Sequence, residues 1–269
     1  MDEFDVVVVG AGPAGETLAG RCADGGLTVA LVERELVGGE CSYWGCVPSK
    51  TLIRPGDVLA AVRRVPGAAE AVTGRLDVAA ALAQRDYMTS SWDDSGQLPW
   101  LEERHIELVR GAGRLDGPHR VAVRSAGDVV RHLAARRAVV LATGTTSALP
   151  PVPGLADVGA WDNRDATAVK NIPRRLLVLG GGAVGVEMAQ AFRRLGSDEV
   201  TVVEVAPRLL AREEPFAGEE VAQALAAEGV TVLVGVSVDE VRRDGPDGPV
   251  TMRVHGHEDV HADEILVAA

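Results

Sequence analysis

A repeated glycine-rich unit constrains the fold of this chain more than any other feature. Residues 6–9 form an apolar run of four valines, as expected of a strand that is buried on both faces of a parallel sheet. Three spaced glycines and a helical stretch follow, and the same order of features returns 170 residues later. The glycines that recur at this interval are Gly10, Gly12, Gly15 and Gly26, with counterparts Gly180, Gly182, Gly185 and Gly196.

Each copy has the features of a dinucleotide-binding βαβ unit. We expect the first helix to end near Asp24 and the second near Leu195, each followed by a strand that ends in an acid, Glu33 or Glu204. In such units the first glycine permits a tight turn, the second admits a pyrophosphate and the third lets the helix pack closely. The pyrophosphate lies at the helix N-terminus, and the acid binds ribose hydroxyls.

The remaining segments complete an α/β chain of two Rossmann-like dinucleotide-binding domains with a small β-meander. We expect further helices at 48–64, 76–85 and 217–228, and strands at 109–126, 137–141, 200–203, 230–234 and 263–269. The proline cluster at 150–153 marks a boundary between a domain at 1–150 and a domain at 151–269.

Charge and hydropathy exclude several classes of function. The net charge of −12 argues against a surface for nucleic acid or for anionic membranes. No uninterrupted apolar run is long enough to span a membrane, and the acidic start is unlike a secretory signal. Three cysteines are too few for a secreted disulfide scaffold, so we expect a cytoplasmic protein.

Cys41 and Cys46 lie eight and thirteen residues after Glu33, so they follow the first predicted nucleotide site closely. On a regular helix this spacing would point the side chains about 140° apart with a rise of about 7.5 Å, so a disulfide needs a distorted turn. Gly45 makes such a turn easier. Three interpretations compete: half of a zinc site, two inert thiols, and a redox disulfide, which the neighbouring nucleotide site favours. Cys22 fits a core position on the first helix.

A single lysine close to the cysteines supports the redox interpretation. The chain has only two lysines, Lys50 and Lys170, against 25 arginines. A compact ammonium at position 50 can stabilise negative charge beside a redox centre.

Residues 39–50, with both cysteines and the sequence Val-Pro-Ser-Lys, resemble the active-site motif of the class I pyridine nucleotide–disulfide oxidoreductases. This family includes dihydrolipoamide dehydrogenase, glutathione reductase and mercuric reductase. Residues 139–145 and 180–187 resemble two further family segments. The resemblance implies that Cys41 is the interchange thiol and Cys46 the thiolate facing the flavin. It also implies that Lys50 lies near the flavin and pairs with Glu187.

The resemblance further implies two bound cofactors, FAD in the first domain and NAD, in preference to NADP, in the second. The residues expected to bind FAD are Gly10, Gly12, Pro13, Ala14, Gly15, Glu33, Arg34, Gly39, Lys50, Gly113, Thr143, Gly144 and Thr145. Those expected at NAD are Gly180, Gly182, Ala183, Val184, Gly185, Glu187, Glu204, Val238 and Ala269. A 2′-phosphate would be repelled by Glu204, although Arg208 and Arg212 follow closely and could accept one.

The implied function is FAD-dependent electron transfer between NAD(P)H and a small-molecule disulfide or dithiol through the Cys41–Cys46 pair. Within the family, the alternatives are reduction of quinones or mercuric ion, and outside enzymes a nucleotide-binding fragment without turnover. Ser42, Tyr43 and Trp44 depart from the small residues typical between the cysteines, and we expect them to reshape the substrate approach.

The second copy of the unit stops where the first continues into Gly144. We therefore expect a truncated chain whose FAD domain lacks its returning segment, and which lacks the C-terminal interface domain of the family, including its acid–base histidine. The resemblance implies a homodimer for the full-length protein.

Overall fold

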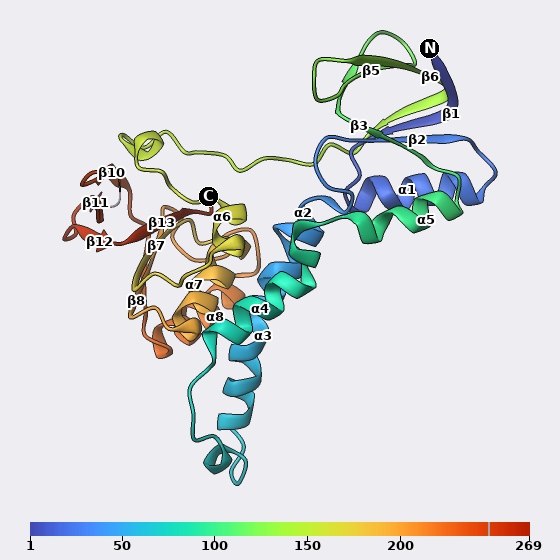
Figure 1. The fold of residues 1–269 in the computed structure, drawn as a ribbon. Coiled ribbons are helices and arrows are strands. Elements are labelled where there is room, and N and C mark those ends of the chain that lie inside the picture. Colours follow the sequence, from blue (N-terminus) through green and yellow to red (C-terminus); the bar gives the residue numbers. More distant parts are fainter. Residues whose placement is uncertain (247) are drawn as a thin grey trace. The chain divides into compact units, whose positions relative to one another are not determined.

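The computed structural model describes residues 1–246 and 248–269, which form two compact units (Figure 1). The first unit comprises residues 1–47 and 86–146, and the second unit comprises residues 48–85 and 147–269. The break at 146/147 lies near the boundary expected from the proline cluster. The segment 48–85, however, packs with the second unit, although it precedes most of the first unit's strands in the sequence.

The first unit is built on one six-stranded sheet of order β3-β2-β1-β6-β5-β4. Strands β3, β2, β1 and β6 are parallel, and β5 and β4 continue the sheet as antiparallel strands. The elements are β1 (Asp2–Val9), α1 (Pro13–Asp24), β2 (Val29–Glu33), α2 (Gly39–Tyr43), α5 (Leu98–Glu103), β3 (Glu107–Arg110), β4 (Ala112–Leu115), β5 (Arg120–Arg124) and β6 (Val130–Leu141), with 3₁₀ turns η2 (Ser90–Trp92) and η3 (Ser95–Gln97).

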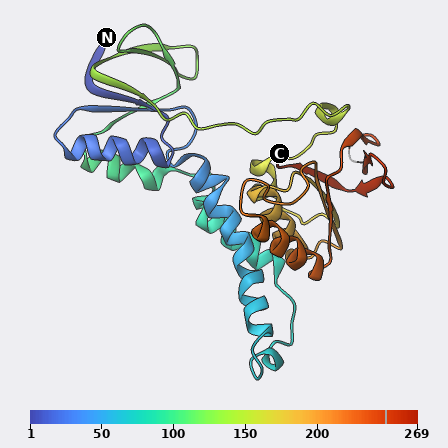
Figure 2. The same cartoon turned by 180° about the vertical axis from the view of Figure 1, so that it is seen from behind.

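The valines of β1 explain why this strand lies at the centre. Val6 and Val8 pack on the face that α1 and α5 cover, whereas Val7 and Val9 pack into a second cluster with β5 and β6. Figures 1 and 2 show α1 and α5 side by side along one face of the sheet. A strand with two covered faces needs the unbroken apolar run that the sequence provides. Cys22, expected at a core position, is partly buried and packs against the helix-covered cluster.

The second unit repeats this plan with a four-stranded parallel sheet of order β13-β7-β8-β9 and a separate antiparallel sheet of order β10-β11-β12. Two of its helices cross the unit boundary by a few residues. Its elements are α3 (Cys46–Arg63), α4 (Val78–Met88), α6 (Asn163–Ala168), β7 (Arg175–Leu179), α7 (Ala183–Leu195), β8 (Glu199–Glu204), α8 (Pro215–Ala227), β9 (Val230–Val234), β10 (Val238–Arg243), β11 (Val250–Val254), β12 (Val260–Ala262) and β13 (Glu264–Val267), with 3₁₀ turns η1 (Ala69–Ala71) and η4 (Leu155–Asp157).

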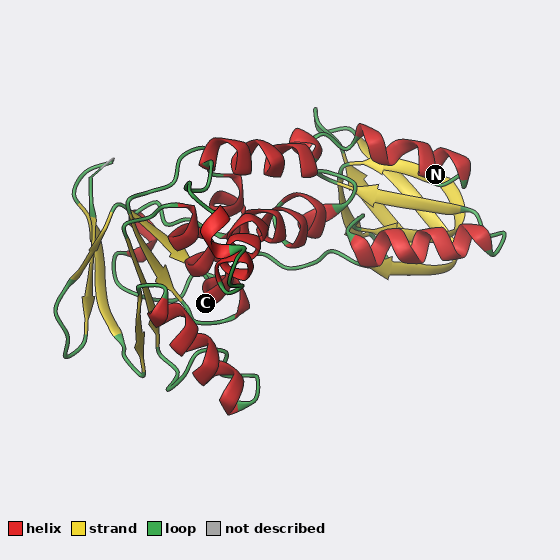
Figure 3. Cartoon of the chain, turned by 90° about the horizontal axis from the view of Figure 1, so that it is seen from below, coloured by secondary structure: helices red, strands yellow, loops and turns green. Residues whose placement is uncertain are grey.

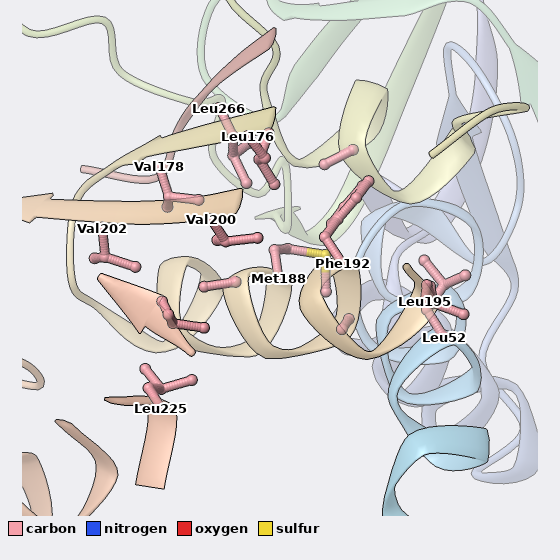
Figure 4. Packing of buried hydrophobic residues seen from close by; sticks show 14 of the residues in the cluster. Leu52, Leu176, Val178, Met188, Phe192, Leu195, Val200, Val202, Leu225 and Leu266 are labelled. Atoms are coloured by element: carbon pink, nitrogen blue, oxygen red, sulfur yellow. The ribbon is translucent and has the colours of Figure 1, made fainter. Parts of the chain in front are cut away.

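Successive side chains of β7 point into two different hydrophobic clusters. Leu176 and Val178 pack with Met188 and Phe192 of α7 (Figure 4), whereas Leu177 and Leu179 pack against the antiparallel strands. The helices and sheets are coloured separately in Figure 3.

The α/β class, the two Rossmann-like units and a small meander agree with the sequence analysis. Several element boundaries differ. The segment 109–126, expected to form short strands, contains the end of β3 together with β4 and β5. Strand β6 begins at Val130 and not at Arg137, and the last strand is limited to Glu264–Val267. Helices α2 and α5 and the strands β10–β12 were not predicted, because short elements carry too few residues for a periodic pattern.

The first and third glycines of each loop are required by backbone geometry. Gly10 and Gly180 have φ values of +104° and +117°, a region that favours glycine. A Cβ at Gly15 would overlap the carbonyl oxygen of Gly10, and a Cβ at Gly185 would overlap that of Gly180. The helix therefore approaches its own loop too closely for any side chain at these positions.

We predict that Gly185→Ala destabilises the second unit by about 2 kcal/mol, because the start of α7 must move away from β7. Gly182→Ala is the matched control, since a Cβ there would lie 3.9 Å from its nearest neighbour, the Ala268 carbonyl oxygen. Hydrogen exchange of the β7 amides measures both variants. Equal hydrogen-exchange protection of the β7 amides in the two variants would show that the close approach of Gly185 to Gly180 does not constrain the fold.

Candidate active site and nucleotide sites

Cys41 and Cys46 form a disulfide, with Cα atoms 4.6 Å apart. Cys41 lies in α2 and Cys46 begins α3, and the chain bends between the two helices at Trp44 and Gly45. The N–H groups of both bend residues donate to the Glu40 carbonyl oxygen, at 2.9 and 2.5 Å. This is the distorted turn that the spacing requires, so the prediction that the two cysteines are close enough to bridge is confirmed.

The segment before the disulfide packs directly on the first glycine loop. The Gly38 N–H donates to the Ala11 carbonyl oxygen at 2.8 Å. Gly39 has a φ of +58°, and a Cβ there would lie only 2.7 Å from the Cα of Gly12. The absence of a side chain at Gly39 therefore lets the dithiol segment lie against the loop expected to hold a pyrophosphate.

Asp94, from a second segment of the first unit, holds the residues that lead into the disulfide. The Asp94 carboxylate accepts from the Val37 N–H at 2.7 Å and pairs with Arg110 at 2.5 Å, and its side chain is only 12% exposed. Arg110 also donates to the Glu35 carbonyl oxygen at 2.7 Å. Sequence reasoning missed this contact, because Asp94 and Val37 are 57 residues apart and share no motif.

The aromatic residues between the cysteines have different surroundings. Tyr43 is 3% exposed and donates its hydroxyl to the Val37 carbonyl oxygen at 3.1 Å. Burial raises the pKa of Tyr43 to about 12. Trp44 is half-buried, and its ring lies 5.7 Å from that of Tyr43. Tyr43 thus stabilises the loop from inside the protein, and of the two rings only Trp44 remains a candidate for shaping the substrate approach.

The acids that end β2 and β8 hold their glycine loops in the same way. Glu33 accepts from the N–H groups of Ala11 and Glu35, at 2.7 and 2.8 Å. Glu204 accepts from those of Gly181 and Ala206, each at 2.6 Å. Each carboxylate oxygen keeps a second lone pair, so both acids can accept ribose hydroxyls without releasing the backbone.

Both glycine loops leave room and donors for an anion. A Cβ at Gly12 or Gly182 would meet nothing closer than 4.0 and 3.9 Å, so the backbone at the second glycine is open to a ligand. These glycines are the N-caps of α1 and α7, and no side chain caps either helix. The free N–H groups and the helix dipole fit a pyrophosphate at both places.

The second unit has a cavity of about 810 Å³ at its glycine loop. The residues expected at NAD that line it are Gly180, Gly182, Ala183, Glu204, Val238 and Ala269. The sequence analysis missed Pro150, Pro151, Val152 and Glu213, which also line it. Arg212 reaches the cavity, whereas Arg208 donates to the carbonyl oxygens of Leu210 and Ala211, so its guanidinium is engaged by its own loop.

Lys50 and Glu187 form an ion pair within the second unit. The Lys50 ammonium lies 2.6 and 2.7 Å from the two carboxylate oxygens of Glu187. Lys50 is in the second turn of α3, four residues after Cys46, and Glu187 is in the second turn of α7. The structure brings together two residues that are 137 positions apart in the sequence.

The other residues expected at the cofactors lie in β4, directly after β2 and β6, and at the starts of α1 and α7. Gly113 is in β4, and a Cβ there would come within 2.8 Å of Val9, so packing alone requires a glycine. Residues 143–145 follow β6 and are exposed, as is Arg34 after β2. Pro13 and Ala14 begin α1, and Val184 lies in the first turn of α7.

Glu16 is a further unusual group, which the sequence analysis did not identify. It lies in the first turn of α1, and its Oε1 atom is buried without a hydrogen-bond partner. Burial, reinforced by the charge of Glu33, raises the pKa of Glu16 to about 7. In the second copy of the repeat the equivalent residue is Val186, so the glycine motif gave no signal for an acid here.

The sequence pattern of the pyridine nucleotide-disulphide oxidoreductases matches residues 4–269, nearly the whole chain. The chain belongs to this family. Its members are oxidoreductases that use FAD and NAD(P)H. Both nucleotide-binding units of the chain are therefore explained by the chemistry of the family, which couples two nucleotide cofactors.

Similar proteins include members of the family with different names. A mercuric reductase from Staphylococcus aureus is 30% identical over 268 residues, which are 99% of this chain and 48% of that protein. A dihydrolipoyl dehydrogenase from Chlorobaculum tepidum is 32% identical over 272 residues, which cover 99% of this chain and 57% of that protein.

A solved structure of the HOCl-induced flavoprotein disulfide reductase RclA from Escherichia coli, as a Cu(II) complex, superposes with a TM-score of 0.85 at 26% identity. The superposition covers 100% of this chain and 57% of that one. The chain thus spans about half the length of the curated relatives that it matches.

Two features are absent from the described residues. None of their helices combines the length and apolar character needed to cross a membrane. Nor do these residues contain a group of three or more histidine, cysteine, aspartate or glutamate side chains that could hold a metal ion.

We predict that Glu16 makes stability fall as pH rises. An unfolded glutamate has a pKa of about 4.3, well below that of Glu16 in the folded protein. The contribution of Glu16 to the free energy of unfolding is therefore fully present below about pH 4.3 and is lost as pH rises through about 7. Glu16→Gln should flatten this dependence and be more stable than the parent at pH 8 by about 1 kcal/mol. Denaturant unfolding between pH 4 and 8 measures it. Exposed Glu102→Gln is the control, and identical pH slopes in the parent and Glu16→Gln would contradict the prediction.

Proposed function

We propose that the chain transfers electrons between NAD(P)H and a small-molecule disulfide or dithiol through bound FAD and the Cys41–Cys46 disulfide. The observation that carries this proposal is the packing of the disulfide segment on the first glycine loop through Gly38, Gly39 and their partners Ala11 and Gly12. A redox-active pair needs a fixed position beside the nucleotide that reduces it, and two side-chain-free contacts provide one.

The proposed assignment puts FAD at the first glycine loop and NAD at the second. It is supported by the open second glycines, the uncapped helices α1 and α7, and the carboxylates of Glu33 and Glu204. FAD supplies a group that can accept a hydride and pass electrons to a disulfide. Because burial raises the pKa of Glu16 to about 7, this acid in the first turn of α1 carries less negative charge near a pyrophosphate at neutral pH than an exposed glutamate would.

The chain's own groups support the thiol chemistry. One NADH reduces one disulfide, with uptake of a proton, to NAD⁺ and two thiols. Cys46 begins α3, where the helix dipole and free N–H groups stabilise a thiolate. Glu187 holds the Lys50 ammonium one turn further along α3. We propose that Cys41, the other member of the pair, exchanges with the substrate.

Three alternatives stand beside the disulfide or dithiol substrate. Several similar proteins are named mercuric reductase, and a pair of thiolates is a good ligand for a soft metal ion, so mercuric ion is a second candidate acceptor. Quinones remain a third acceptor class on the same scaffold. Outside enzymes, the alternative is a chain that binds nucleotides without turnover.

Thiol release tests the proposal directly. With FAD present, NADH should raise the thiol count from one per chain, Cys22, to three. Cys46→Ser should abolish the NADH-dependent increase, whereas the control Cys22→Ser should change the count from zero to two. A labelling reagent with mass spectrometry gives both numbers.

If NADH releases no thiols from the folded, FAD-supplemented parent chain, the electron-transfer proposal fails and the nucleotide-binding fragment stands. Where thiols are released, turnover with lipoamide, glutathione disulfide, mercuric ion and quinones identifies the acceptor class. Wild-type thiol release in Cys46→Ser would refute the role of the Cys41–Cys46 pair.

We predict that the chain binds NADH about tenfold more tightly than NADPH, a difference of about 1.4 kcal/mol, because Glu204 repels a 2′-phosphate and Arg208 is engaged by its own loop. Calorimetric titration measures both affinities. Glu204→Gln should narrow the difference, whereas Glu213→Gln, in the same cavity, should leave it nearly unchanged. Tighter binding of NADPH would show that Arg212 decides the preference.

A further inference from the structure

Two ion pairs link α3 and α7 at equal intervals. Lys50 and Asp57 are seven residues apart on α3, and their partners Glu187 and Arg194 are seven residues apart on α7. Seven residues are close to two helical turns, so both pairs lie on the facing sides of two helices that run in the same direction. The charges alternate: α3 supplies the cation to the first pair and the anion to the second.

The second pair is much more firmly held than the first. Arg194 pairs with Asp57 at 2.5 Å, and it also donates to both carboxylate oxygens of Glu228, at 2.6 and 2.7 Å. Its side chain is 15% exposed, whereas that of Lys50 is 62% exposed. A buried guanidinium in a two-point contact has little freedom to move, whereas an exposed lysine has a great deal.

Helix α3 also packs closely against α7 beside Arg194. Gly56 lies against the aliphatic part of the Arg194 side chain, and a Cβ at Gly56 would come 3.1 Å from the Arg194 Cβ and closer still to its Cδ. One turn earlier, Leu52 is buried in the same cluster as Leu195 at the end of α7 (Figure 4). The Asp57–Arg194 pair therefore lies beside a close, apolar helix contact.

We propose that Asp57 and Arg194 are positioning residues, whose ion pair fixes the register of α3 on α7 in which Lys50 reaches Glu187. A slip of one turn in either direction moves α3 by about 5.4 Å, which separates both pairs at once. The register follows from the contacts alone. Its importance for electron transfer rests on the proposed function, in which Lys50 acts beside the redox centre.

The small number of lysines permits a direct measurement of this register. A carbodiimide joins a carboxylate to an amine in contact, and the chain has only Lys50 and Lys170 besides its N-terminus. We expect a Lys50–Glu187 crosslink in the parent chain, identified by mass spectrometry, and its loss in Glu187→Gln. No nucleotide is added, so the result does not depend on turnover.

Asp57→Asn should lower the yield of this crosslink about two- to fivefold, the range expected when a partly exposed ion pair is lost. Asp57→Glu restores a carboxylate and should recover most of the yield. Arg54→Gln, an exposed substitution on the same helix, is the matched control and should leave the yield unchanged. Asp57 is 47% exposed, so its variants should fold, and circular dichroism verifies this.

An unchanged crosslink yield in folded Asp57→Asn overturns the proposal. An equal loss in Arg54→Gln also overturns it, because the effect is then general to α3. Failure of NADH to release thiols, with the crosslink pattern as expected, refutes the proposed function and leaves the register intact. Normal thiol release with an insensitive crosslink refutes the register alone.

Discussion

The arrangement of the first unit's site depends on two hydrogen bonds made by the backbone of Ala11. Its N–H donates to Glu33 at the end of β2, and its carbonyl oxygen accepts from Gly38 at the start of the dithiol segment. The backbone of this one residue thereby ties the glycine loop to the second strand and to the residues that lead into Cys41. This arrangement is possible because Gly39 has no side chain to keep its backbone away from that of Gly12.

In the second unit the backbone of Gly181 makes the two equivalent hydrogen bonds, but the second one holds a different segment. The Gly181 N–H donates to Glu204, and its carbonyl oxygen accepts from Leu210 at 2.9 Å. The loop that follows leads into α8 and lines the cavity at the glycine loop, and the described part of this unit contains no disulfide. One local solution thus serves two purposes: it holds a dithiol in the first copy and shapes a ligand cavity in the second.

Helix α3 connects thiol chemistry to packing within a single element. Its first residue is Cys46, its second turn carries Lys50, and its later turns carry Gly56 and Asp57, which contact Arg194. A position far from any reacting atom can therefore determine whether Lys50 meets Glu187. In this proposal the Asp57–Arg194 contact, which involves the largely buried Arg194 side chain, sets the position from which the exposed Lys50 reaches Glu187.

The sequence alone predicted the two βαβ units and their tight glycine turns, and it favoured a disulfide among three interpretations of the cysteine pair, because each of these depends on residues that are close in the chain. The family motif also pointed to the pairing of Lys50 with Glu187. Only the tertiary structure showed that Asp94 braces the dithiol loop, that Glu16 is buried beside Glu33, and that residues 48–85 pack with the second unit. These features join residues that are distant in sequence or depend on burial, and neither a periodic pattern nor a spacing records which surfaces meet.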